Sequence, residues 1–402
     1  MIRTFPLCRV IGTLLACLLS VNGHGHGETP TEVGTRVSAA VSVTWRDDGM
    51  LLQDDGRWLI PGVLMGGEAY PVDGGVTVDE ARLDLAHRTA ERVFGRLQIS
   101  SHDGVSDAEI HHAYGGLQLD TGPVLTTLAA GRMAAAMTPA NGEHASDRLF
   151  SETPLPLQAF LGSQLNDDGA RVSLDLGAWQ LGLESWRGDS FPAAGEGEEL
   201  NDVYLHYRDG WNGVPVFAGI WWLQADAVNR SDTRYSADGH DHGSVSQSTT
   251  LPEYWFDGRT EIGGAFLRLA GGHASHWHWA LEAQYLQVSI EGSVRDSTRL
   301  APWSAEDNGG WLQASLGRGA HTLGLRWERL VLENHLSGAA AGALADLTGL
   351  YNPDHDPQRS SAVYHWQVQP GLALRLEAVD DGIQMESIQR IAVGLVWQAE
   401  LL

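Results

Sequence analysis

Histidines that stand beside carboxylates are the residues of this chain best suited to chemistry. The chain has 17 histidines in 402 residues. Imidazole together with carboxylate suits zinc, copper or nickel. The candidate metal ligands form three groups: His24 with His26; His240 with Asp241 and His242; and His276 with His278. Their spacings match no fixed motif, so two interpretations stay open: weak, exchangeable capture of zinc or a similar ion, or solvated histidines with no metal role. We expect no tightly bound cofactor.

The last of these groups lies at the start of a predicted strand over residues 275–290. Alternation along this strand places Trp277 and Trp279 on the outward face. His276 and His278 would then share the inward face, near a strand end. Two histidines at positions i and i+2 can supply two ligands to one ion.

Gly188-Asp189-Ser190 resembles the nucleophile block of a class of lipases and esterases. A nucleophilic serine needs a histidine base and a group that orients the base. In those enzymes the block stands near the start of an α/β domain. Here it follows a Trp-rich strand in mid-chain, without helical periodicity around it. An outer-membrane esterase that uses Ser190 is therefore only a minor alternative, and we expect no enzyme.

Charged residues at every second position mark one face of several predicted strands. In residues 80–85, for example, each charged residue is followed by Ala or Leu. A strand with this period has one polar and one apolar face. The charged residues that face inward on this parity are Glu80, Arg82, Asp84, Arg171, Asp175, Arg326, Glu328, Arg375 and Glu377. They either line a pore, where weak binding favours passage, or pair across strands and stiffen the wall.

The same alternation recurs from residue 37 to the C-terminus. No stretch after residue 22 offers the ~20 consecutive apolar residues that a spanning helix needs. A closed sheet with lipid outside and water inside uses the pattern throughout. We therefore predict an all-β fold, a transmembrane up-and-down antiparallel β-barrel of about 16 strands. The predicted strands cover residues 37–46, 80–87, 91–100, 109–119, 125–133, 171–177, 179–187, 201–208, 214–224, 259–269, 275–290, 310–317, 321–332, 361–368, 371–379 and 391–397.

Two segments depart from this rhythm. Residues 57–65 form either an additional strand or an N-terminal extension. Residues 134–168 contain Pro139, Pro154 and Pro156 and show no sustained alternation. A long insertion of this kind is usually functional or disordered. It either folds into the pore as a constriction or forms an ordinary extracellular loop.

The N-terminus has the features of an export signal. Arg3 and Arg9 precede a short apolar run over residues 10–19, and small residues follow it. We predict a signal peptide over residues 1–23, a His/Gly-rich N-terminal segment over 24–36, and a transmembrane barrel with long extracellular loops over 37–402. This organisation predicts a protein exported to the bacterial outer membrane.

From about residue 109 onward, the order of short motifs resembles a family of proteobacterial porins related to the phosphate-selective porins. The motifs are Gly116-Leu-Gln-Leu119, Ala130-Gly-Arg132, Leu157-Gln-Ala-Phe-Leu-Gly162, Asp167-Asp-Gly-Ala-Arg-Val-Ser173, Trp186-Arg-Gly-Asp189 and Leu323-Gly-Leu-Arg-Trp327. The resemblance implies a barrel of sixteen or eighteen strands, often trimeric, that passes small solutes. Two features depart from the family: this chain has no lysine, and it ends in Leu402 rather than in an aromatic residue.

The chain carries 51 acidic and 26 basic residues, a net charge of −25. This excess should draw cations, and without a basic stripe we expect no nucleic-acid partner. We therefore predict a channel for passive diffusion of small hydrophilic solutes that favours cations and is linked to zinc or other divalent metals. The alternative is a non-conducting barrel that captures metal or a partner through its His/Asp loops. Expected partners are membrane lipid, small solutes or metal ions, and two further copies of the chain.

Overall fold

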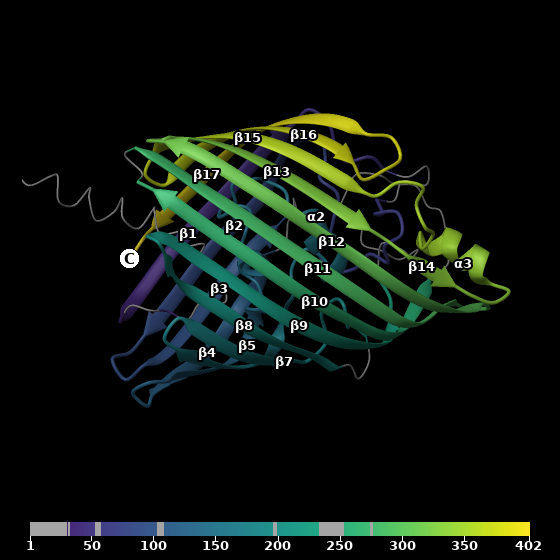
Figure 1. Ribbon diagram of the computed structural model, residues 1–402, viewed down its shortest axis with the longest axis horizontal. Helices are drawn as coiled ribbons and strands as arrows, with labels where there is room; N and C mark the ends of the chain where they lie inside the picture. The colour runs from purple at the N-terminus through teal and green to yellow at the C-terminus, as the bar shows by residue number, and fades with distance from the viewer. Residues whose placement is uncertain are drawn as a thin grey trace, which may run out of the picture.

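The computed structural model describes residues 30, 33–52, 58–102, 108–195, 199–232, 253–273 and 276–402. Within these residues, seventeen β-strands form one antiparallel sheet, and β1 (Gly34–Arg46) pairs with both β2 (Gly75–Arg88) and β17 (Ile388–Glu400). The sheet therefore closes into a barrel of tilted strands (Figure 1). β13 (His321–Val331) and β14 (Asn334–Leu336) pair with successive parts of β12 (Leu300–Arg318), so they count as one strand of the wall. The barrel thus has sixteen strands, as predicted.

The remaining strands follow the chain in up-and-down order. They are β3 (Val93–His102), β4 (Glu109–Asp120), β5 (Leu125–Ala134), β6 (Asn166–Leu176), β7 (Trp179–Trp186), β8 (Glu199–Trp211), β9 (Val214–Arg230), β10 (Tyr254–Gly272), β11 (Trp277–Asp296), β15 (Gln358–Gln369) and β16 (Leu372–Gly382). The described helices are η1 (Pro139–Gly142), α2 (Leu155–Leu161) and α3 (Ala341–Thr348). Each of these helices is too short or too polar to cross a membrane.

The outward face of the barrel is apolar. Leu83, Leu183 and Leu325 stand exposed on it, while their charged sequence neighbours are turned inward. Trp179, Trp211 and Trp277 each adjoin a short turn, and they are 50%, 72% and 57% exposed. Tryptophan in such a ring is typical of the boundary between lipid and water. The short-turn end of the barrel therefore carries an aromatic belt.

Two long connections fold into the barrel from the opposite end. The first lies between β1 and β2, where Leu59, Ile60 and Met65 are buried. Residues 58–65 are irregular, so the strand interpretation of residues 57–65 is wrong for the part that the structure describes. The sequence pattern was misleading at this segment, because apolar residues of an irregular segment that packs inside a barrel need not follow the two-residue period of a strand. The second connection, residues 135–165, joins β5 to β6 and includes α2, which lies within the barrel in Figure 1. We call it the inward loop.

Candidate functional site: the barrel interior and its inward loop

The structure turns all nine predicted charged residues toward the interior. Seven are buried, and Arg82 and Asp175 are partly buried. Several form ion pairs along or across the wall, including Arg171 with Glu184, Arg326 with Glu328, and Arg82 Nε with Glu80 Oε1 at 3.3 Å. The predicted direction of these side chains is therefore correct. That these residues line a conducting path remains a prediction.

Glu152, on the inward loop, lies at the centre of a buried cluster of charged side chains. Arg359 Nη1 donates to Glu152 Oε2 at 2.7 Å, and Arg390 Nη1 donates to Glu152 Oε1 at 2.6 Å. Arg359 Nη2 also donates to Glu328 Oε2 at 2.8 Å. Burial alone would raise the pKa of the Glu152 carboxyl, but Arg390 and Arg359 outweigh burial and hold that pKa well below its usual range. The loop is thus bound to the wall by a fully ionised carboxylate.

Backbone groups of the inward loop bind the same side of the wall. The Ser151 amide donates to Glu377 Oε1 at 2.9 Å, and the Ser146 amide donates to a Glu80 oxygen at 2.8 Å. Arg375 Nη1 donates to the Ala145 carbonyl at 3.1 Å. Charges that alternation predicts as pore-lining therefore serve here as partners for the polypeptide backbone of the loop.

The inward loop also reaches the opposite side of the barrel. Thr138 Oγ1 donates to Gln284 Oε1 at 2.7 Å, and the Ala136 amide donates to Glu184 Oε2 at 2.9 Å. Glu143 Oε1 lies 2.6 Å from Arg268 Nη1. Contacts to β7, β10 and β11 on one side and to β2, β15 and β16 on the other show that the loop crosses the interior.

The inner wall from β8 to β12 carries a group of aromatic side chains among its charged ones. Tyr204 stacks on His206 with ring centroids 4.5 Å apart, and Phe266 meets His206 edge-on at 5.2 Å. Trp221 and Trp311 are buried on the same side. The expectation of water throughout the interior is therefore only partly met within the described residues, because apolar side chains pack on this side of the wall. One side of the wall is mainly ionic, the other mixes aromatic with charged side chains such as Arg268, and the inward loop lies between them.

Of the predicted metal ligands, the structure describes His276 and His278. His24, His26, His240, Asp241 and His242 fall outside the described residues. His278 faces inward as predicted, with Nε2 at 3.2 Å from Thr322 Oγ1. His276 precedes β11, in the turn, and its ring packs edge-on against His273. The expected common face for His276 and His278 is therefore wrong, because the strand begins at Trp277, two residues later than predicted.

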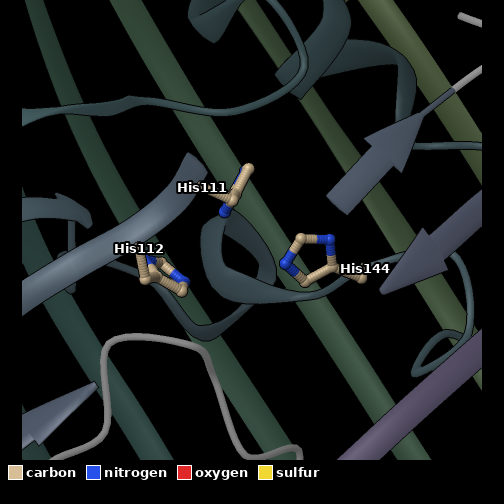
Figure 2. Close-up of side chains that lie close together, drawn as sticks. All are labelled: His111, His112 and His144. Carbon is tan, nitrogen blue, oxygen red and sulfur yellow. The ribbon is translucent and has the colours of Figure 1, made fainter. Parts of the chain in front are cut away.

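A different histidine cluster lies where β4 meets the inward loop. His111, His112 and His144 are buried, and one possible ligand nitrogen from each lies within 4.8 Å of the other two. Figure 2 shows the three rings around a common space. Sequence reasoning missed this cluster, although the adjacent pair His111-His112 inside a predicted strand was a signal. Strict alternation would send one member of that pair outward.

Ser190 lacks the surroundings of a nucleophile. Its Oγ donates to the Asn166 carbonyl at 2.5 Å, and its amide donates to Asp167 Oδ2 at 3.4 Å. Within the described residues, no hydrogen bond joins Ser190 to a histidine. A serine whose hydroxyl proton is held by a backbone carbonyl has no base positioned to remove it.

Comparison with known proteins identifies the fold alone. No protein-family model matches the chain, and no curated protein matches it. A loop-deletion mutant of OmpT, an outer-membrane protein of Vibrio cholerae, has a TM-score of 0.55 at 10% identity, covering 91% of this chain and 99% of that one. An anion-selective porin from Comamonas acidovorans has a TM-score of 0.52 at 11% identity, with coverages of 92% and 100%. The outer-membrane channel DcaP of Acinetobacter baumannii has a TM-score of 0.51 at 12% identity, with coverages of 93% and 99%. The chain therefore has a porin-like barrel fold.

Proposed function

We propose that this protein is an outer-membrane channel through which small hydrophilic solutes diffuse passively. The observation that carries the proposal is the inward loop, which crosses a closed barrel with an apolar exterior and binds its ionic inner wall. Such a loop narrows a pore and places charge at its narrowest part, which is how channels select solutes. Two proteins of similar fold are described as a channel and as a porin, and this supports the proposal.

The proposed channel favours cations. The net charge of the chain is −25, and the interior retains carboxylates that are bonded to groups other than arginine. Asp175, for example, accepts from Gln180 Nε2 at 2.8 Å. A carboxylate bonded to a neutral donor keeps its negative field. The link to zinc or another divalent metal is the finer part of the proposal, and it is supported by the 17 histidines.

The remaining parts of the proposal come from the sequence. Residues 1–23 would direct export, and the barrel would assemble in the outer membrane as a homotrimer of the kind that the porin resemblance implies. The phosphate-selective branch of that family fits less well, because its members look lined with arginine and lysine, whereas this chain has no lysine and a net charge of −25. The protein would act without catalysis or a resident cofactor.

A non-conducting barrel is the second candidate function. It is favoured by the two long connections that occupy the interior, whose side chains pack with the aromatic wall into one apolar cluster. In this case the barrel would bind a metal or a partner at its long-loop end. The third, minor candidate is an esterase, which predicts ester hydrolysis that the Ser190→Ala substitution abolishes. We expect instead that Ser190→Ala leaves any ester hydrolysis at its background rate, which would reject the esterase.

Conductance in a planar bilayer distinguishes the first two candidates. We expect stepwise conductance from the purified, folded protein, and a reversal potential in a salt gradient that shows cation preference. The Asp175→Asn variant should shift that potential toward anions, whereas Glu306→Gln, an exposed carboxylate on the outward face, should leave it unchanged. Silent membranes would reject the channel. Strong anion preference would reject only its cation selectivity.

A further inference from the structure

The cluster of His111, His112 and His144 joins two separate parts of the fold. His111 and His112 belong to β4, and His144 belongs to the inward loop just after η1. All three are at least 95% buried, with exposed fractions of 5%, 0% and 3%. The ring centroids of His111 and His144 are 4.7 Å apart, and those of His111 and His112 are 4.9 Å apart.

A β-bulge brings two adjacent histidines to the same side of the wall. The register between β3 and β4 shifts at Gln98, which pairs with His112, while Ile99 pairs with Ile110. His111 is therefore the extra residue of the bulge, and both rings point inward. Bulges commonly redirect a side chain in this way next to functional sites.

One neighbouring polar group orients its histidine as metal-binding histidines are oriented. Glu80 Oε1 lies 3.4 Å from His144 Nδ1, and a carboxylate that accepts from one ring nitrogen directs the lone pair of the other toward an ion. At His111 the amide nitrogen Nδ2 of Asn166 donates to Nδ1 at 3.0 Å, so an ion bound at that nitrogen would replace this amide. Gln98 Nε2 lies 2.9 Å from His144 Nε2, so an ion bound at that nitrogen would replace this amide.

The local charge also suits a cation. Glu80 and Asp147 both pair with Arg82, and Asp84 pairs with Arg96. Of these carboxylates, Glu80 reaches the histidine cluster, through His144. A carboxylate buried beside three imidazoles adds an oxygen-bearing group that favours a divalent ion.

We propose that His111, His112 and His144 bind one divalent transition-metal ion of the class that includes zinc, copper and nickel, and that the ion fastens the inward loop to β4. Three histidines with an open fourth position are an established zinc ligand set, with Zn–N distances of about 2.0–2.1 Å. Tetrahedral geometry at those distances separates the nitrogens by about 3.3 Å. The present separation of up to 4.8 Å therefore closes by side-chain rotation on binding. This site is independent of whether the barrel conducts.

Zinc titration by calorimetry tests the proposal. The histidines outside the described residues would compete, so the measurement uses the folded full chain in which His24, His26, His240 and His242 are replaced by asparagine. We expect one zinc ion per chain. His112→Gln and His144→Gln should each weaken binding at least about tenfold, whereas the exposed control His335→Asn should not. Circular dichroism and thermal melting verify that each variant is folded.

A second measurement needs none of the cluster variants. Cobalt(II) added to the same background protein should give the visible absorption of a four-coordinate, nitrogen-ligated ion, and excess zinc should remove it. Zinc should also slow tryptic cleavage after Arg148, the arginine of the inward loop. Failure of the background protein to bind zinc or cobalt at micromolar concentrations would overturn the proposal. Equal zinc affinity in the wild-type cluster and the His144→Gln variant would do the same.

Discussion

Glu152 Oε2 lies 2.7 Å from Arg359 Nη1, although the two residues are 207 positions apart in the chain. The contact joins the inward loop to β15, and Arg390 of β17 binds the other oxygen of the same carboxylate. Because all three side chains are buried, each charge depends on the others for its solvation. Ion pairs with the wall therefore hold the inward loop in its position.

Glu152→Gln should release the inward loop. The substitution preserves size but leaves two buried guanidinium groups without their shared counter-charge, and removing one partner of a buried ion pair costs about 3–5 kcal/mol. Tryptic cleavage after Arg148 measures the release, because the site is protected while the loop is bound. Glu306→Gln changes an exposed carboxylate and serves as the control. Equal cleavage rates in wild type and Glu152→Gln would show that other contacts hold the loop.

Acid should act on the same carboxylate. The folded-state pKa of Glu152 lies below the ordinary value of 4.5, because Arg390 and Arg359 outweigh the opposing effect of burial. The stabilisation is therefore complete above about pH 4.5 and is lost as the pH falls through the folded-state pKa. The melting temperature of wild type should exceed that of Glu152→Gln by a constant amount at neutral pH. That difference should shrink below about pH 4.5, and a difference that grows in acid would contradict the assignment.

Gly264 and Gly263 offer a matched pair of substitutions on β10. A Cβ atom at Gly264 would overlap the indole of Trp221 on the adjoining strand, whereas a Cβ atom at Gly263 would meet no heavy atom within 4 Å. Gly264→Ala should destabilise the barrel by about 1–3 kcal/mol, the usual result of overpacking. Gly263→Ala should be neutral or slightly stabilising. Equilibrium unfolding in urea compares the two, and equal stabilities would refute the proposed packing of Trp221 over Gly264.

The direction of the wall side chains could be predicted from sequence, because a closed sheet obliges each strand to alternate. Glu80, Arg326 and Glu377 were placed correctly on that basis alone. Their partners could not be predicted, since Glu377 binds Ser151 across 226 positions and alternation carries no information on such contacts. The aromatic part of the interior was missed for a related reason: alternation shows which residues face inward but not what packs against them.

The histidine cluster shows a second limit of periodicity. His111 and His112 are neighbours in sequence and should lie on opposite faces, yet the bulge opposite Gln98 turns both inward. A bulge inserts one residue and reverses the parity beyond it. Alternation therefore predicts the direction of Glu80 on β2 correctly. It fails for His111 because the bulge interrupts the regular pairing of β4.

The outward face gives a direct test of membrane insertion. On β13 the outward row runs His321, Leu323, Leu325, Trp327 and Arg329, with polar residues at its two ends and Leu325 at its centre. Leu325→Arg should therefore cost about 2–4 kcal/mol, the penalty for arginine near the bilayer midplane, and Ser304→Arg, near the long-loop end of β12, should cost about 0–1 kcal/mol. Refolding into phospholipid vesicles at several urea concentrations measures both. Similar losses for the two variants would mean that Leu325 does not lie at the middle of a lipid layer. If so, the apolar exterior would need a different partner, such as the surface of another protein chain.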